Sequence, residues 1–205
     1  MLTLILAEAA LEVVNGEVLD VSRHRSVIRR LPNPHKRGRP DIVHLFLLTA
    51  MGSPLSAAGL LRVLIHTVND EIIIVDPRER PPQNYNNFIG LMRQLFRLGS
   101  VPPSGSPLLR LVRGGIGDAV SLSRASRVVM LDDSRGVKVP ARDLARRVLS
   151  LGDVAVIMGG FPHGSFEEST YAVVQEAYRI GDRPMRTHEV ACRFLAMIES
   201  ELGYY

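Results

Sequence analysis

The apolar run Val154–Met158 is followed directly by the loop Gly-Gly-Phe-Pro-His-Gly at residues 159–164. The run predicts a buried strand, and the three glycines and one proline predict a sharp loop at its end. Because glycine carries no side chain, backbone N–H and C=O groups in such a loop can approach a ligand closely. A second loop of this kind, Ile-Gly-Asp-Arg-Pro-Met, occupies residues 180–185. The pair of loops favours a nucleotide-like ligand held by main-chain groups, and two ordinary turns are the alternative.

Predicted strands and helices alternate along most of the chain. This alternation predicts an α/β fold with a mainly parallel sheet flanked by helices, in which ligands bind beyond the carboxyl ends of the strands. We also expect residues 8–14 to be helical and residues 114–117 to form a turn. The predicted strands are 2–7, 60–65, 71–75, 128–131, 153–158 and 173–180, and the predicted helices are 21–31, 41–51, 88–96, 141–149 and 190–198.

Composition limits the classes of protein to which this chain can belong. Its 205 residues can bury one sizeable core. No apolar stretch approaches the roughly 18 residues of a membrane span. The apolar N-terminus lacks a basic lead, so we expect a first strand rather than a signal peptide. The single cysteine, Cys192, excludes an internal disulfide and is typical of a reducing compartment, so we expect a cytoplasmic protein without a membrane partner.

Several common kinds of site have no counterpart in the sequence. The six histidines are scattered and the cysteine is alone, so we expect no metal site. A Walker A loop, a Gly-x-Gly-x-x-Gly motif and the Gly-x-Ser-x-Gly motif of serine hydrolases are all absent.

The positive charge of the chain is carried almost entirely by arginine. The net charge is +4, and Lys36 and Lys138 are the only lysines. Arginine binds phosphates through paired hydrogen bonds and stacks on bases, which suits RNA. Residues 21–40 contain seven arginine and lysine side chains and no acidic one. This segment therefore predicts a phosphate-binding face, with a solvated helix face as the alternative.

Two polar segments have the composition of an RNA site. Pro40 holds Arg39 in an extended conformation, so Arg39 and Asp41 can pair and keep the guanidinium group in a fixed pose. Residues 78–87 combine arginine, glutamine, asparagine and tyrosine, whose side chains hydrogen-bond to base edges and stack on bases. The alternatives are a helix-capping Asp41 beside an exposed arginine, and an ordinary loop before the next helix.

At these residues the sequence resembles the EMG/Nep family of ribosome-biogenesis methyltransferases, which belong to the SPOUT class. The resemblance extends through most of the chain and rests on several ordered motifs at matching separations. The chain is similar to the archaeal form, which lacks a long N-terminal extension. The matching motifs are RPDIVH at 39–44, SPL at 53–55, AGLLRVLIHT at 58–67, DPRERPP at 76–82, FIGLM at 88–92 and the 159–164 loop.

The resemblance implies a single SPOUT-like domain over residues 1–205, with an RNA-binding insertion at about 21–90 and a C-terminal trefoil knot. It implies methyl transfer from S-adenosylmethionine to N1 of a pseudouridine in small-subunit ribosomal RNA, and a role in small-subunit biogenesis. The implied partners are a second copy of the chain, bound with the help of the C-terminal helices, and ribosomal or assembly proteins of the small subunit.

The resemblance also implies site residues. Arg39 and Asp41 are the candidates for catalytic roles. The RNA would contact Arg39, Arg80, Gln83 and Asn87, with Asp41 steadying Arg39. The cofactor would contact Leu131, Gly159, Gly164, Ile180, Gly181, Asp182, Arg183, Pro184 and Met185.

Three positions depart from the family. Members often carry arginine where this chain has Gln83 and Asn87, which weakens the expected phosphate binding. Many members carry an acid where Gly52 stands here. No obvious base is present for the N1 proton, so we expect catalysis mainly by positioning. The alternatives are a SPOUT methyltransferase acting on a ribose 2′-hydroxyl or another base, and an RNA-binding assembly factor whose catalysis is dispensable or lost.

Overall fold

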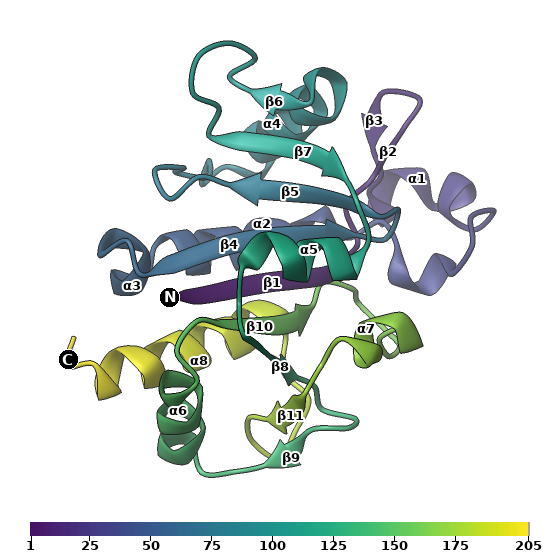
Figure 1. The fold of residues 1–205 in the computed structure, drawn as a ribbon. Coiled ribbons are helices and arrows are strands. Elements are labelled where there is room, and N and C mark those ends of the chain that lie inside the picture. Colours follow the sequence, from purple (N-terminus) through teal and green to yellow (C-terminus); the bar gives the residue numbers. More distant parts are fainter. Residues whose placement is uncertain (205) are drawn as a thin grey trace.

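The computed structural model describes residues 1–204, and its centre is a sheet of nine strands (Figure 1). In their order across the sheet, the strands are β6 (Ser100–Val101), β7 (Leu109–Arg113), β5 (Glu71–Val75), β4 (Leu61–Thr67), β1 (Leu2–Ala9), β10 (Val154–Gly159), β8 (Arg127–Leu131), β11 (Glu176–Arg179) and β9 (Val137–Lys138). The strands from β4 to β9 are parallel, whereas β5, β7 and β6 pair antiparallel beside β4. The predicted α/β fold with a mainly parallel sheet is confirmed.

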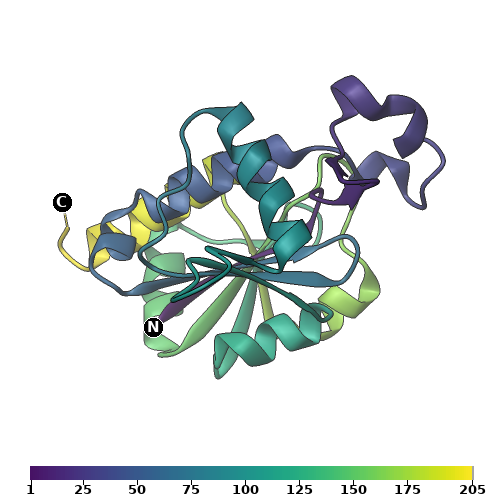
Figure 2. The same cartoon turned by 90° about the horizontal axis from the view of Figure 1, so that it is seen from above.

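Helices cover both faces of this sheet. One face is covered by α2 (Pro40–Met51), α4 (Tyr85–Leu98), α6 (Ala141–Ser150) and α8 (Thr187–Glu201). Figure 2 shows α2, α4 and α8 on one side and, on the other, α5 (Ile116–Ser123) and α7 (Glu168–Ala172). The smaller elements are α1 (Val21–Ile28), the 3₁₀ helix η1 (Pro34–Lys36), α3 (Pro54–Ala57) and the hairpin strands β2 (Val13–Val14) and β3 (Glu17–Val18). Among residues 1–204, no helix is both long and apolar enough to cross a membrane.

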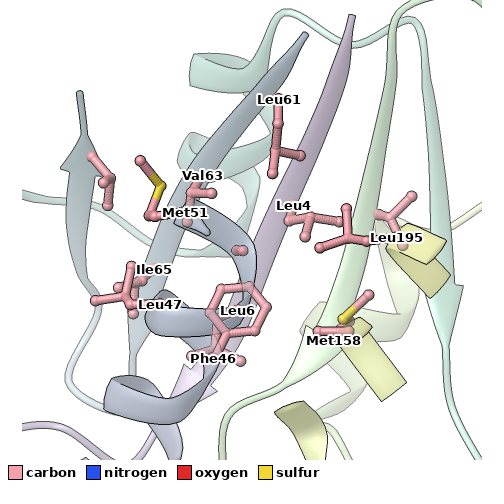
Figure 3. Packing of buried hydrophobic residues seen from close by; sticks show 14 of the residues in the cluster. Leu4, Leu6, Phe46, Leu47, Met51, Leu61, Val63, Ile65, Met158 and Leu195 are labelled. Atoms are coloured by element: carbon pink, nitrogen blue, oxygen red, sulfur yellow. The ribbon is translucent and has the colours of Figure 1, made fainter. Parts of the chain in front are cut away.

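Strand alternation divides the core between the two faces. In β1, Leu4 and Leu6 point to the α2 and α8 side, whereas Ile5 and Ala7 point to the α5 and α7 side. All four are fully buried. Figure 3 shows Phe46 of α2 in the same packed layer as Leu6. A central strand with two apolar faces is expected of a mainly parallel sheet, because helices cover both sides.

Two local predictions are wrong. Residues 8–14 are not helical, because β1 continues to Ala9 and residues 13–14 form a strand of the hairpin. Residues 114–117 are not an isolated turn, because Gly114 and Gly115 join β7 to α5 and residues 116–117 begin that helix. There the Asp118 carboxylate accepts a hydrogen bond from the N–H of Gly115 at 2.9 Å and caps the helix. The strand predicted at 173–180 is shorter, at Glu176–Arg179. The strand predicted at 71–75 has the predicted ends, and the other predicted elements are present with shifted ends.

A buried ion pair joins the end of β1 to the segment that contains η1. The Glu8 carboxylate accepts hydrogen bonds from Lys36 Nζ at 2.7 Å, and from the Glu167 N–H and the Thr170 hydroxyl at 2.8 Å each. Burial alone would lower the pKa of Lys36, but its hydrogen bonds to Glu8 and Glu167 outweigh burial and raise that pKa. Three segments far apart in the sequence are therefore held by one carboxylate.

Removal of the lysine charge tests this role. Lys36→Met leaves the Glu8 carboxylate buried without its cation, so we expect the free energy of unfolding to fall by about 3–5 kcal/mol. Urea unfolding at pH 7, followed by circular dichroism, measures the change. Lys138→Met is the matched control, because Lys138 pairs with Asp182 on the surface. Equal effects of the two substitutions would contradict a structural role for the Glu8 pair.

Candidate functional site

A cavity of about 390 Å³ lies at the carboxyl ends of β8, β10 and β11. Its walls are formed by the 159–164 loop after β10 and the 180–185 loop after β11. We call it the loop cavity. Its position agrees with the expectation that ligands of α/β sheets bind beyond the carboxyl ends of the strands.

Most of the residues predicted to contact a cofactor line the loop cavity. Gly181, Asp182 and Arg183 belong to the second loop but are not among the lining residues. Asp182 pairs instead with Lys138, at 2.5 Å between Oδ1 and Nζ. The structure therefore brings the two predicted loops together, and the ligand contacts of single residues stay a prediction. The predicted residues that line the cavity are Leu131, Gly159, Gly164, Ile180, Pro184 and Met185.

Close packing of the main chain shapes the 159–164 loop. The N–H of Gly160 donates to the carbonyl of Ala7 at 2.8 Å, and a Cβ on Gly160 would lie 2.6 Å from Ala9 Cα. Only glycine fits this position. Gly164 has φ +100°, a conformation that L side chains rarely adopt. The hydroxyl of Thr187 donates to the Gly159 carbonyl at 2.7 Å and ties the loop to the start of α8.

Two aromatic rings connect the loop cavity to the buried ion pair. Phe161 meets Phe166 edge to face, with ring centroids 5.2 Å apart. The Lys36 Nζ lies 4.8 Å from the Phe161 centroid, within the range of a cation–π contact. Both rings line the loop cavity. The Lys36 ammonium group therefore contacts both the carboxylate that anchors its segment and a ring of the cavity wall.

Sequence reasoning missed three charged residues that line the loop cavity, Asp132, Asp133 and Arg179. Burial and the nearby Asp132 carboxylate raise the pKa of Asp133, against a smaller opposing effect of the Met185 N–H. The Arg179 Nε is buried and has no hydrogen-bond partner within residues 1–204. The sequence could have indicated Asp133 as a site residue, because it follows the predicted strand 128–131 and ligands bind beyond the carboxyl ends of such strands.

A second cavity of about 580 Å³ adjoins the first. It is lined by Arg39 and Asp41 from the start of α2 and by Arg186 and His188 from the start of α8. We call it the Arg39 cavity. The two cavities share one wall, which consists of Phe161, Pro162, Pro184, Met185 and Thr187.

The predicted pair of Arg39 and Asp41 is confirmed. The guanidinium Nε donates to Oδ1 at 2.8 Å and Nη2 donates to Oδ2 at 2.7 Å. These hydrogen bonds raise the pKa of Arg39, which stays charged. Both side chains are 39 % exposed, so the pair is held in place yet open to a ligand. Pro40 occupies the first turn of α2, where its missing N–H costs no helical hydrogen bond.

The other predicted RNA contacts, Arg80, Gln83 and Asn87, line neither cavity. Gln83 and Asn87 are exposed at the start of α4, and Arg80 donates to the carbonyls of Pro77 and Glu79 in its own loop. The start of α4 is fixed against α2, because Phe88 stacks on His44 of α2 with centroids 4.6 Å apart. These residues therefore lie on a surface beside the Arg39 cavity rather than inside it.

The basic segment 21–40 does not present all of its charges to solvent. Lys36 is buried in the Glu8 pair, and Arg37 binds Glu12, Asn69 and the Pro32 carbonyl. The prediction that Lys36 and Arg37 belong to a phosphate-binding face is therefore wrong, because both side chains bind groups of the protein itself. The exposed members of the segment are Arg23, Arg25, Arg29 and Arg30.

Gly52 lies far from the two cavities within the protomer. It follows the last residue of α2, whereas Arg39 precedes the first. Thirteen residues at about 1.5 Å per residue separate them by roughly 20 Å. An acid at position 52 therefore could not reach a base bound at Arg39 of the same chain.

Comparison with known sequences identifies the family. The sequence model of the EMG1/NEP1 methyltransferase family matches residues 4–199. The chain is 40% identical over 224 aligned positions to a protein of Pyrobaculum arsenaticum named Ribosomal RNA small subunit methyltransferase Nep1, and the alignment covers 98% of each chain. A protein of the same name from Thermococcus kodakarensis is 34% identical, with 99% of this chain and 100% of the relative covered.

A solved structure is similar over the same extent. The crystal structure of Archaeoglobus fulgidus Nep1 bound to S-adenosylhomocysteine superposes with a TM-score of 0.84 and 31% sequence identity, covering 97% of both chains. This similarity supports the SPOUT-type fold, while the trefoil knot stays a prediction. A family match over nearly the whole chain, together with relatives at this identity, confirms the resemblance: the chain belongs to the EMG1/NEP1 methyltransferase family.

Proposed function

We propose that this chain transfers a methyl group from S-adenosylmethionine to N1 of a pseudouridine in small-subunit ribosomal RNA. The observation that carries the proposal is the shared wall between the loop cavity and the Arg39 cavity. One cavity is suited to the methyl donor and the other to the RNA, so donor and acceptor would meet across that wall. The names of the relatives and the S-adenosylhomocysteine bound to the structural neighbour support both ligand assignments.

The loop cavity has the properties that S-adenosylmethionine requires. Its volume of about 390 Å³ lies within the usual range of small-molecule pockets. The unpartnered Arg179 Nε and the Asp133 carboxyl group offer one cation and one acid, which complement the carboxylate and ammonium groups of an amino acid. Glycines at 159 and 164 leave main-chain groups accessible to the adenosine part.

The residues of this chain act mainly by positioning. When bound, S-adenosylmethionine supplies a methyl group that its sulfonium already activates. Arg39, fixed by Asp41, binds a phosphate of the RNA and sets the place of the target nucleotide. The target base leaves its stack to reach the cavity, as substrates of base-modifying enzymes do.

Asp41 is a positioning residue rather than the acceptor of the N1 proton. Both of its carboxylate oxygens accept hydrogen bonds from the Arg39 guanidinium group. The carboxylate is therefore already occupied by the guanidinium group that it orients. Its task is therefore to hold Arg39 in one orientation.

Four finer assignments belong to the same proposal. They are a cytoplasmic location, contacts with ribosomal or assembly proteins of the small subunit, an RNA-binding insertion at about 21–90 within one domain, and a homodimer. The apolar stripe of α8 packs inside the protomer, where Phe194 and Leu195 are buried against its own core. The dimer proposal therefore rests on the family resemblance, and light scattering of the purified protein tests it.

The proposed target base can be tested directly. We expect radiolabelled methyl transfer from S-adenosylmethionine to a stem-loop RNA with pseudouridine in its loop, and none to the matched RNA with uridine there. Uridine attaches its sugar at N1 and so offers no free N1 to methylate. Transfer to both RNAs would favour a ribose 2′-hydroxyl or another base, and binding of both without transfer would favour an assembly factor.

The second prediction separates the two cavities. We expect Arg39→Ala to weaken binding of the stem-loop RNA by about 10- to 100-fold, because it removes a fixed phosphate contact. Binding of S-adenosylhomocysteine should stay unchanged. Fluorescence anisotropy measures the RNA affinity and titration calorimetry measures the other. Arg147→Ala is the matched control, because Arg147 pairs through two hydrogen bonds with Glu176 outside both cavities. Equal loss of both ligands in Arg39→Ala would overturn this division.

A further inference from the structure

Three arginines without a hydrogen-bonded carboxylate gather around one groove in the part of the chain that the structure describes. Arg110, Arg113 and Arg124 line a shallow groove of about 630 Å³, together with Arg62. We call it the arginine groove. Several other exposed arginines bind acids of the protein itself, namely Arg78, Arg93, Arg135, Arg142, Arg146 and Arg147. Cations left unpaired at one place indicate a surface that meets an external anion.

The register of the sheet builds this groove. Leu64 of β4 pairs with Ile74 of β5, which pairs with Arg110 of β7, so these three side chains form a row on one face. Val112 lies on the same face two residues further along β7. Helix α5 packs on β4 and β1 (Figure 1). Ile74 and Val112, on the neighbouring strands β5 and β7, are half-buried. The floor of the groove is therefore an apolar strip, and arginine side chains line the groove around it.

The charge of the groove is strongly one-sided. Among the lining residues that the structure describes, Asp118 is the single acid, and its carboxylate caps α5 through the Gly115 N–H. Glu71 lies near Arg113, which lowers the pKa of that glutamate against the larger effect of burial. Arg62 donates one N–H to the Ser123 carbonyl, which steadies its guanidinium group and leaves other N–H groups available. Four guanidinium groups thus face a single lining carboxylate.

We propose that the arginine groove binds the phosphodiester backbone of ribosomal RNA at a segment outside the target loop. This inference rests on the proposed function, because it requires an RNA substrate. No aromatic side chain is among the lining residues described, so the groove is suited to phosphates rather than to stacked bases.

The groove is distant from the methyl-transfer site. Five strand-to-strand steps, at about 4.8 Å each, place β7 with Arg110 roughly 24 Å from β8, whereas β4 with Arg62 lies two steps from β10. The apolar floor belongs to the face that α5 and α7 cover, whereas α2 and α8, which carry the lining residues of the Arg39 cavity, lie on the other face. A short stem-loop held at Arg39 would not fill the groove, but an extended RNA would reach it.

The test compares two RNAs and two pairs of substitutions. One RNA is the short stem-loop with pseudouridine, and the other carries the same loop with its flanking ribosomal sequence. Arg110→Gln with Arg124→Gln should weaken binding of the extended RNA by about tenfold and lower the slope of log K against log salt by roughly 1.5. Binding of the short RNA should stay unchanged. Arg97→Gln with Arg193→Gln, which removes two exposed charges elsewhere, should change neither affinity.

Other results would overturn the proposal. If Arg110→Gln with Arg124→Gln binds the extended RNA with unchanged affinity, the groove is assigned to an acidic protein segment instead. If this variant loses affinity equally for both RNAs, the groove recognises no separate RNA segment. The single variant Arg113→Gln gives an independent measurement, and thermal melting checks that each variant is folded. Methyl transfer to the short RNA by the unaltered protein reports on the proposed function separately from the groove.

Discussion

The Glu8 carboxylate is the interaction on which the arrangement of the site depends. Glu8 lies one residue before the end of the central strand β1, and its carboxylate accepts hydrogen bonds from Lys36 in η1 and from Glu167 and Thr170 at the start of α7. Lys36 in turn lies against the Phe161 ring of the cavity wall. A buried carboxylate without its cation is costly, so these segments fold together or not at all. The basic segment, the strand and the ligand loop are consequently one structural unit.

Local patterns in the sequence were sufficient to predict the two loops and the Arg39–Asp41 pair, whereas pairings between distant residues could not be predicted. The hydrogen bonds between Arg39 and Asp41 join residues two apart, and the 159–164 loop directly follows an apolar strand, so both could be predicted from short stretches of sequence. Lys36 and Arg37 bind acids 28 and 25 residues away. A basic segment whose side chains bind acids of the protein has the same composition as one whose side chains are free to bind RNA. For that reason Lys36 and Arg37 were wrongly assigned to a phosphate-binding face.

The difference between local patterns and distant pairings also explains the errors in the predicted secondary structure. The mainly parallel sheet follows from the alternation of apolar runs and helical periodicity. The helical prediction for residues 8–14 failed because Glu8 adopts φ +53° to meet its partners, which local propensity does not report. The strand-to-helix passage at 114–117 was missed although Asp118 stands at a capping position, since the alternating residues of β7 had not been recognised as a strand.

The wall shared by the loop cavity and the Arg39 cavity has a thermodynamic consequence. Five residues line both cavities. If the two cavities hold the methyl donor and the RNA, as proposed, any ordering of this wall by one ligand alters the free energy with which the other binds. Thermodynamic linkage makes this effect reciprocal: the factor by which the methyl donor changes RNA affinity equals the factor by which RNA changes donor affinity. After transfer the donor has lost its methyl group and its positive charge, and the same wall then couples release of the spent cofactor to release of the modified RNA.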